Sequence, residues 1–432
     1  MLNNRFKNID KCKFRNIFII IIAFSIVIFK GNNILGSTLT NEELFCASDI
    51  AMDMDTGTIL YGKNHTSKIY PASTTKILTA ILTIENIDLK KSITVSQNAY
   101  NSTPYGSSVM GVKAGETFTV EELLYGLMLP SGNDAAIVLA EAVSGSVDNF
   151  VYLMNMKLKE LNLNDTHFVN PHGFHDDNHY STATDMANLL KYCLQNDTFK
   201  KIISTLEYTI GPTNLTKEPR TLRNTNRICD PLYTNIYYEY ILGGKTGYTI
   251  EANGTFVGYG SKDDKNIILC TFNGSQNING NQGRFLDATK LAKYCFDNFK
   301  KETIIKADDY TFKLYDKDNN KYYIIGINED FTTLINHNEI THINTELLTN
   351  FDTLDILSSS EETSINNSNI GFLKIYNSNN KIINTLNLKY LGSGYYTNSF
   401  VIKENYTYSI LLVFIILIAM IFVTMYTSRN EK

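Results

Sequence analysis

Residues 71–80 read PASTTKILTA, a stretch that places a serine three positions before a lysine. Pro71 precedes apolar residues with helical spacing, so the sequence predicts Ser73 at the start of a helix and Lys76 one turn further on. Residues three apart share one face of a helix, so the two side chains are expected to lie together. A serine becomes a nucleophile only beside a base, and a lysine acts as one only when burial or a second cation lowers its pKa. Taken alone, the pair is better explained as a helix cap followed by a surface charge.

Two further polar motifs follow in the same chain. The tripeptide SGN at 131–133 interrupts two apolar helical runs, and KTG at 245–247 follows two glycines. Each could be an ordinary turn, and SNNK at 378–381, in a predicted hairpin, shows that S-x-x-K alone is not specific. The ordered set of S-x-x-K, S-x-N and K-T-G is typical of penicillin-binding proteins and class A β-lactamases.

Five stretches together carry a resemblance to a known family: PASTTKILTA, LLYGLMLPSGNDAA, FVYLMNMKLKELNLNDTHFVNPHGF, HYSTATDMANLL and GGKTGYT. From about Asp49 to Phe299 the chain resembles the low-molecular-mass penicillin-binding proteins that are serine-type D-Ala-D-Ala carboxypeptidases, similar to peptidase family S11. The resemblance implies removal of the terminal D-alanine from peptidoglycan stem pentapeptides through an acyl-enzyme on Ser73. It also implies β-lactam antibiotics as acylating inhibitors, and no cofactor.

The resemblance assigns roles in the acylation chemistry to four residues. Ser73 would attack the carbonyl of the terminal peptide bond, with Lys76 as the acceptor of its proton. Ser131 would relay that proton towards the leaving D-alanine. Asn133 would hold the amide of the substrate and help to position the lysine.

A second group of residues would bind the substrate. Lys245 supplies a second positive charge, which would keep Lys76 neutral and attract the substrate carboxylate. Thr246 could donate a hydrogen bond to that carboxylate, and Gly247 lets a ligand backbone approach closely. The oxyanion hole would use the backbone N–H groups of the nucleophile and of Tyr248. Arg284 occupies a place similar to that of a family arginine that meets the carboxylate.

Composition limits the possible partners. The chain has 432 residues, a formal net charge of −5 and 43% apolar residues, enough for two or three ordered domains. No concentrated basic patch remains beyond the first 37 residues, so a nucleic-acid partner is not expected. Six scattered cysteines without a CxxC pair do not form a disulfide framework.

Both ends of the chain indicate a membrane. Basic residues precede the apolar run at 17–29, so 1–37 is predicted to be a secretory signal, cleaved near Gly36 or Ser37, or else an uncleaved anchor. Residues 406–427 carry no charge, which predicts a transmembrane helix. Basic residues follow it, so the tail at 428–432 is predicted to be cytoplasmic and the catalytic domain extracytoplasmic, at the cell membrane.

The pattern between these ends predicts an α+β fold. Strand-like and helix-like stretches alternate at 38–302, and this favours an antiparallel sheet flanked by helices, the β-lactamase/transpeptidase-like fold of the resembling family. Helices are expected at 74–85, at 120–143 with an interruption, and at 147–161. Beyond residue 302 the strand–turn–strand patterns predict a small β-rich, membrane-proximal domain at 303–400.

Three alternative functions share the motifs. A D,D-transpeptidase passes the acyl group to an amine and needs the same residues. A class A β-lactamase needs an additional glutamate, and Glu160 lacks the required spacing. A catalytically silent peptidoglycan-binding protein would carry the motifs without forming an acyl-enzyme.

A cluster of histidines at 167, 172, 175 and 179, with Asp176 and Asp177 among them, allows a metal site. The alternative is that these histidines pack and hydrogen-bond near the rim of the active site. The proposed chemistry needs no metal, so none is predicted.

Overall fold

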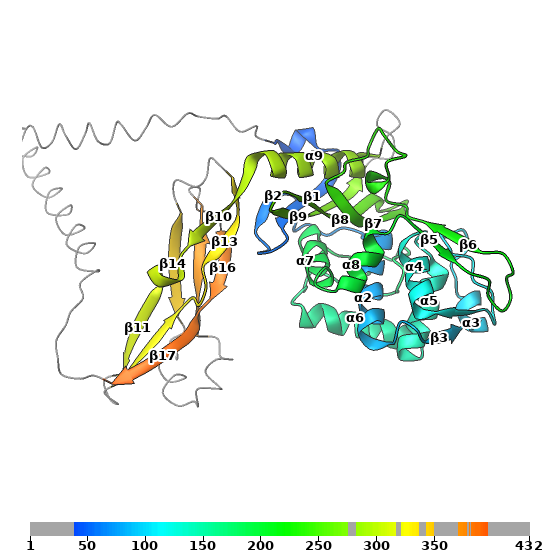
Figure 1. Ribbon diagram of the computed structural model, residues 1–432, viewed down its shortest axis with the longest axis horizontal. Helices are drawn as coiled ribbons and strands as arrows, with labels where there is room; N and C mark the ends of the chain where they lie inside the picture. The colour runs from blue at the N-terminus through cyan, green and yellow to red at the C-terminus, as the bar shows by residue number, and fades with distance from the viewer. Residues whose placement is uncertain are drawn as a thin grey trace, which may run out of the picture. The chain divides into compact units, whose positions relative to one another are not determined.

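The computed structural model describes residues 39–274, 282–316, 321–336, 343–349, 370–377, 380 and 382–395 (Figure 1). Contacts divide the chain into two compact units. The first runs to Ala307 and adds Glu329–Leu348 and Phe372–Leu386, and the second holds Asp308–Asn328 and the described parts of 349–371 and of the chain from Asn387 on. The predicted division at 302/303 stays a prediction, and the two units alternate along the chain after residue 307.

The predicted signal at 1–37, the transmembrane helix at 406–427 and the tail at 428–432 lie outside the described residues. Within the described ranges, no single helix is both long and apolar enough to cross a bilayer. Two consecutive helices, Asn133–Ser144 and Val147–Glu160, reach the required length and hydropathy only when they are taken together, and their axes differ by 83°.

The centre of the first unit is a five-stranded antiparallel sheet in the order β2-β1-β9-β8-β7. Its strands are β1 (Cys46–Asp53), β2 (Ile59–Lys63), β7 (Ile241–Thr249), β8 (Asn253–Lys262) and β9 (Lys265–Gly274). The order leaves β7 at one edge, and β7 carries the KTG motif. A turn around residues 55–57 joins β1 to β2.

Helices cover both faces of this sheet, which confirms the predicted α+β class (Figure 1). One face packs against α9 (Gly283–Asn298). The other face packs against a helical group, whose members are α2 (Lys76–Asn86), α3 (Gln97–Asn101), α4 (Val120–Met128), α5 (Asn133–Ser144), α6 (Val147–Glu160), α7 (Ala183–Cys193) and α8 (Asp197–Ser204). Two short hairpins, β3 (Ser92–Thr94) with β4 (Thr117–Thr119) and β5 (Glu207–Ile210) with β6 (Arg220–Arg223), border the helices.

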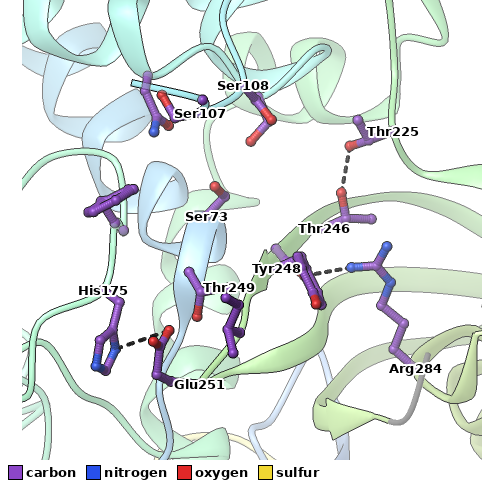
Figure 2. A pocket seen from close by; sticks show the side chains of 17 residues that line it. Ser73, Ser107, Ser108, His175, Thr225, Thr246, Tyr248, Thr249, Glu251 and Arg284 are labelled. Atoms are coloured by element: carbon purple, nitrogen blue, oxygen red, sulfur yellow. Dashed lines mark hydrogen bonds and ion pairs between the residues drawn. The ribbon is translucent and has the colours of Figure 1, made fainter. Parts of the chain in front are cut away.

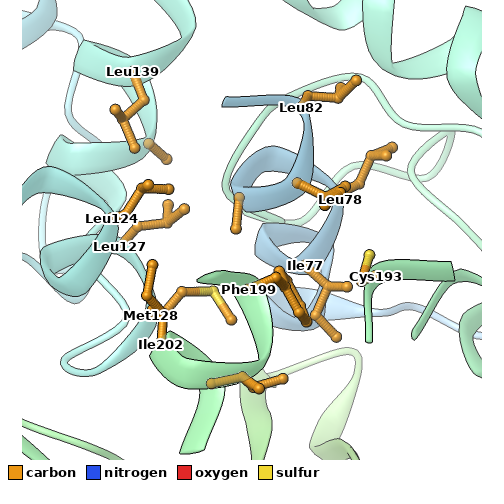
Figure 3. Packing of buried hydrophobic residues seen from close by; sticks show 14 of the residues in the cluster. Ile77, Leu78, Leu82, Leu124, Leu127, Met128, Leu139, Cys193, Phe199 and Ile202 are labelled. Atoms are coloured by element: carbon orange, nitrogen blue, oxygen red, sulfur yellow. The ribbon is translucent and has the colours of Figure 1, made fainter. Parts of the chain in front are cut away.

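Helix α2 lies at the centre of the helical group, as the burial of all its first eight residues shows. Ile77, Leu78 and Leu82 pack among side chains of α4, α5, α7 and α8 (Figure 3). A helix buried on every face has its position fixed by all its neighbours. The residues at its N-terminus are therefore held rigidly.

The described C-terminal strands form three small groups. Strand β10 (Phe299–Ile305) pairs with β13 (Phe331–Asn336), and a three-stranded sheet has the order β14-β15-β16 (Asn344–Thr349, Gly371–Tyr376, Ile382–Asn387). The second unit contains the sheet β11-β12-β17 (Thr311–Asp316, Lys321–Gly326, Lys389–Tyr395). Within the first unit, the buried carboxylate of Asp53 accepts hydrogen bonds from the Thr333 hydroxyl (2.8 Å) and the Leu334 N–H (2.9 Å).

Another buried aspartate on β1 has no such partners. Asp49 is fully buried, and neither of its carboxylate oxygens has a hydrogen-bond partner among the described residues. Burial, together with the nearby charge of Asp287, raises the pKa of Asp49 to about 8. The folded chain therefore binds a proton at Asp49 that the unfolded chain releases at neutral pH.

This difference predicts a pH-dependent gain in stability for Asp49→Asn. The folded pKa of Asp49 lies above its unfolded value, so the wild-type protein loses stability as the pH rises from about 4 to about 8. We expect the neutral asparagine to remove this loss and to raise the melting temperature at pH 8 by roughly 5 °C, with little change at pH 4. Calorimetry of both proteins across this pH range measures the difference.

Asp53→Asn is the matched control, because it removes an acceptor of formed hydrogen bonds and should lower the melting temperature. An Asp49→Asn protein whose stability follows the wild-type pH dependence would contradict the prediction.

Candidate active site

Ser73 lies on a short 3-10 turn, Ala72–Thr75, that leads directly into α2. Ala72 has a left-handed backbone with φ of +49°, an unfavourable conformation for a residue with a side chain. The turn is held by its neighbours: the Thr75 hydroxyl donates to Ala72 O (2.8 Å), and the Thr255 hydroxyl of β8 donates to Pro71 O (3.2 Å). The predicted helix thus begins with a 3-10 turn, and this turn places Ser73 at the cavity described below.

Lys76 lies fully buried behind Ser73, and its amine contacts three oxygens. Nζ is 2.9 Å from Ser73 Oγ, 2.6 Å from Asn133 Oδ1 and 2.7 Å from the backbone oxygen of His172. Burial, and to a lesser degree the charge of Lys245, holds the pKa of Lys76 well below its usual value.

The three contacts suit a neutral amine. A neutral lysine has two N–H donors and one lone pair. Asn133 Oδ1 and His172 O can only accept, so they take the two donors. The lone pair is then left for the Ser73 hydroxyl, which is the one partner that has a proton to give. The geometry therefore places a base 2.9 Å from a serine oxygen.

The SGN motif forms the connection between α4 and α5. Ser131 has φ of +65°, is buried, and its hydroxyl has no hydrogen-bond partner among the described residues. Asn133 is the first residue of α5, and its N–H donates to Ser108 O (2.8 Å). The next residue, Asp134, accepts the N–H groups of Met110, Gly111 and Val112 at 2.8–3.1 Å and so ties this turn to the neighbouring loop.

The KTG motif lies on β7 beside the nucleophile turn. A Cβ atom on Gly247 would be 2.8 Å from Ser73 N and 2.4 Å from Thr255 Oγ1, so only glycine lets the strand approach Ser73 this closely. Lys245 is almost fully buried and donates to Thr246 O (2.7 Å). Burial and the nearby charge of Arg284 lower the pKa of Lys245 to about 7.

Arg284, on the first turn of α9, reaches back to β7. Its Nη1 donates to Gly247 O (2.5 Å) and Thr255 O (3.3 Å), and Gln282 receives its other donors. Burial, with Arg227 nearby, lowers the pKa of Arg284 to about 10, so it stays charged at neutral pH. The side chain of Tyr248 is half exposed, so this residue offers the site mainly its backbone.

These segments surround one cavity of about 580 Å³ (Figure 2). Of the nine sequence-predicted site residues, seven line the cavity: Ser73, Ser131, Asn133, Thr246, Gly247, Tyr248 and Arg284. The other two, Lys76 and Lys245, are buried behind its wall. In Figure 2, Ser73 lies near the centre, with Arg284 on one side and His175 on the other.

The four histidines of the cluster contact different groups and do not converge on one point. Burial lowers the pKa of His172 and of His179 to about 3, so both rings are neutral. The His167 ring contacts Asn178 O, and the His172 ring accepts from the Phe174 N–H. The His175 ring lies near the carboxylates of Asp177 and Glu251. The His179 ring contacts the Val169 N–H and Thr75 Oγ1. Among the described residues, the group whose atoms lie close enough for a metal is Cys46, Asp49 and Asp287. The histidine cluster therefore fits the packing alternative.

Several site residues were not found from the sequence. The cavity is also lined by Ser107, Ser108, Phe174, Thr225 and Glu251, and Thr225 Oγ1 is 2.5 Å from Thr246 Oγ1. Asp134 directly follows the SGN motif and could have been suspected for that reason. Phe174 ends one of the five stretches that carry the family resemblance, and the remaining residues come from loops without a distinctive pattern.

Comparison with known proteins agrees with this geometry. Residues 36–276 match the family model Peptidase_S11, D-alanyl-D-alanine carboxypeptidase. The chain is 33% identical to the D-alanyl-D-alanine carboxypeptidase DacF of Bacillus subtilis over 64% of this chain and 69% of that protein. It is also 33% identical to a D-alanyl-D-alanine carboxypeptidase of Streptomyces sp. K15 over 61% of this chain and 92% of that protein.

Solved structures show the same fold. Penicillin-binding protein 5 of Haemophilus influenzae superposes with a TM-score of 0.63 at 24% identity, covering 83% of this chain and all of that one. The Streptomyces K15 DD-transpeptidase superposes with a TM-score of 0.54 at 29% identity, covering 60% of this chain and 99% of that one. The fold is thus that of the penicillin-binding enzymes and transpeptidases. Within that class, this chain belongs to the peptidase S11 family of D-alanyl-D-alanine carboxypeptidases.

The close approach of β7 predicts the effect of Gly247→Ala. The added methyl group would collide with backbone at Ser73 and would push the strand away from the nucleophile. We expect acylation by penicillin to slow by roughly 100-fold, the scale for a misplacement of about 1 Å. Gly211→Ala is the control because nothing lies within 4 Å of its Cβ position, and it should react at the wild-type rate. Unchanged acylation of the Gly247→Ala protein would disprove this packing constraint.

The two buried lysines predict a shift in pH dependence. Removing the charge in Lys245→Gln makes protonation of Lys76 easier, so the pKa of Lys76 rises. Because Lys76 acts as a base only when neutral, the acidic limb of the kcat/KM profile for D-alanine release should move to higher pH. Lys245→Arg keeps the charge and should keep the limb in place. A limb at the wild-type pH in Lys245→Gln would show that the two amines are not coupled.

Proposed function

We propose that this chain cleaves the terminal D-Ala-D-Ala bond of peptidoglycan stem pentapeptides through an acyl-enzyme on Ser73, and so acts as a serine-type carboxypeptidase. Family membership supports the activity. The observation that carries the mechanism is the amine of Lys76, fully buried and 2.9 Å from Ser73 Oγ, with its two acceptor-only neighbours.

In the acylation step, Ser73 Oγ attacks the carbonyl carbon of the penultimate D-alanine while its proton moves to Lys76 Nζ. The carbonyl oxygen becomes negative and accepts hydrogen bonds from the backbone N–H groups of Ser73 and Tyr248. The C–N bond then breaks, Ser131 gives its hydroxyl proton to the leaving amine of D-alanine, and the proton held by Lys76 moves to Ser131, so that Lys76 is neutral again. The hydroxyl of Ser131, buried at the cavity wall without a partner among the described residues, suits this relay.

Deacylation repeats these steps with water as the nucleophile. Lys76 accepts a proton from the water, the water oxygen bonds to the acyl carbon, and the ester bond to Ser73 Oγ breaks with return of the proton to that oxygen. Asn133 keeps the amine in place by accepting one of its protons.

The substrate carboxylate would bind at the side of the cavity where Arg284 lies. Thr246 can donate a hydrogen bond to it, and Arg284 and Lys245 supply positive charge nearby. Arg284 already donates to Gly247 O, so its contribution at this position is mainly through its charge.

A D,D-transpeptidase is the second candidate. Proteins of Streptomyces K15 that resemble this chain carry both names, D-alanyl-D-alanine carboxypeptidase and DD-transpeptidase. The two activities differ only in whether water or an amine resolves the acyl-enzyme. The acylation residues proposed here serve both.

We further propose that the catalytic part works outside the cytoplasm, at the cell membrane. The basic start with its apolar run at 17–29 and the uncharged segment 406–427 support export and a C-terminal anchor. Access to wall peptides requires this location. A protease added to intact cells tests it, because it should digest the catalytic part and leave the tail at 428–432 intact.

The activity is tested with Ser73→Ala and Lys76→Ala. The full-length wild-type protein, incubated with a fluorescent penicillin and with a D-Ala-D-Ala peptide, should form one slowly decaying adduct and should release D-alanine. Ser73→Ala should form no adduct while it melts as the wild type does, because the nucleophile is lost. Lys76→Ala should be nearly as inactive, with a loss of about 10³-fold or more. Intact mass and released D-alanine are the readouts.

The outcomes separate the alternatives. An adduct that turns over rapidly without cleavage of the peptide would indicate a β-lactamase, and no adduct at all would indicate a silent binding protein. Transfer of the acyl group to an added amine in preference to water would indicate a transpeptidase. Full turnover by Lys76→Ala would refute Lys76 as the base.

A further inference from the structure

Thr225 makes a hydrogen bond to the KTG motif that the mechanism above does not use. It lies between β6 and the 3-10 turn Arg227–Cys229, and it lines the cavity. Its Oγ1 is 2.5 Å from Thr246 Oγ1, and the two side chains point toward one another in Figure 2. Either hydroxyl can be the donor of this hydrogen bond.

A bound carboxylate removes this ambiguity. A carboxylate only accepts hydrogen bonds, and each hydroxyl has one proton to give. If Thr246 donates to the carboxylate, its oxygen can meet Thr225 only as an acceptor, so Thr225 must donate. The chain then runs from Thr225 to Thr246 to the carboxylate, and each bond in such a chain strengthens the next.

The backbone holds Thr225 where this chain needs it. Its N–H donates to Leu129 O (3.1 Å), two residues before Ser131. On either side, the Asn226 N–H donates to Asn224 Oδ1 (2.9 Å) and Asn224 Nδ2 donates to Thr205 O (2.8 Å). The segment is therefore fixed against both the end of α4 and the end of α8. The backbone position from which the Thr225 hydroxyl extends is fixed with it.

We propose that Thr225 is a positioning residue for substrate recognition: it donates to Thr246 Oγ1 and so directs the Thr246 proton to the terminal carboxylate of the substrate. This inference rests on the proposed function, because it needs Thr246 to bind that carboxylate. Thr225 itself does not touch the reacting atoms. Its effect is confined to substrates that end in a free carboxylate.

The test compares two acyl donors on the full-length protein. One is an N-acetylated peptide that ends in D-Ala-D-Ala. The other is the same peptide ending in one D-alanine as its methyl thioester, whose leaving group has no carboxylate. Thr225→Val removes the hydroxyl at nearly constant shape, and Thr225→Ser keeps it.

We expect Thr225→Val to lower kcat/KM for the D-Ala-D-Ala peptide by about tenfold, mainly through KM, as for the loss of one aligned hydrogen bond to a charged group. The rate with the thioester should stay at the wild-type value, and Thr225→Ser should match the wild type on both. In a Thr246→Val background, Thr225→Val should have no further effect, since the two residues act as one unit.

Equal losses on both donors would overturn the proposal, because they would show that Thr225 only supports the fold. An unchanged Thr225→Val, or a Thr225→Ser protein as impaired as Thr225→Val, would overturn it too. A wild-type protein that forms the acyl-enzyme from neither donor would instead refute the proposed function, and the wild-type measurement separates that failure from the others.

Discussion

The burial of one amine, that of Lys76, is the constraint on which the rest of the site depends. A charged ammonium without water is costly, so burial favours the neutral form, and a neutral amine at neutral pH is a base. The structure supplies this environment from three separate parts of the chain: α2 carries the lysine, α5 supplies Asn133, and the loop before α7 supplies His172 O. Of the three groups that contact the Lys76 amine, Ser73 is the one with a hydroxyl proton to give.

The segments that carry the three motifs are also joined by hydrogen bonds that do not involve the reacting atoms. Asp134 connects the SGN turn to residues 110–112, Thr255 connects β8 to Pro71, and Thr225 connects β7 to the end of α4. Most of these contacts are hydrogen bonds between a side chain and the backbone. They fix distances between segments that are far apart in sequence, which is what a preorganised site requires.

Much of the fold followed from local pattern. Helix periodicity located α2 and α6 to within two residues, and it located the interruption between α4 and α5, because each of these helices has a clear apolar face. The motifs identified the residues around Ser73. The placement of Arg284 rested on the family resemblance, since no local pattern connects α9 to β7.

Other features depend on long-range packing that a single sequence does not display. The left-handed backbone of Ala72 is stabilised by contacts with β8 and with the turn itself, and nothing about an alanine suggests it. Thr225 is one threonine among many, and its importance arises from a neighbour 21 positions away. The burial of Asp49, whose carboxylate oxygens have no hydrogen-bond partner among the described residues, could not be foreseen, because a charged side chain in a strand is expected to face solvent.

The tight packing around Ser73 also bears on when the chain becomes reactive as it is made. A Cβ on Gly173 would be 1.8 Å from Ala72 O, and Pro71 is held by Thr255, 184 positions further on. Lys76 in turn relies on a carbonyl 96 positions away. Such a contact cannot form until both of its partners have been synthesised. A chain that ends before residue 255 therefore carries the motif around Ser73 without the hydrogen bond that holds Pro71, and one that ends before residue 172 also lacks an acceptor for Lys76.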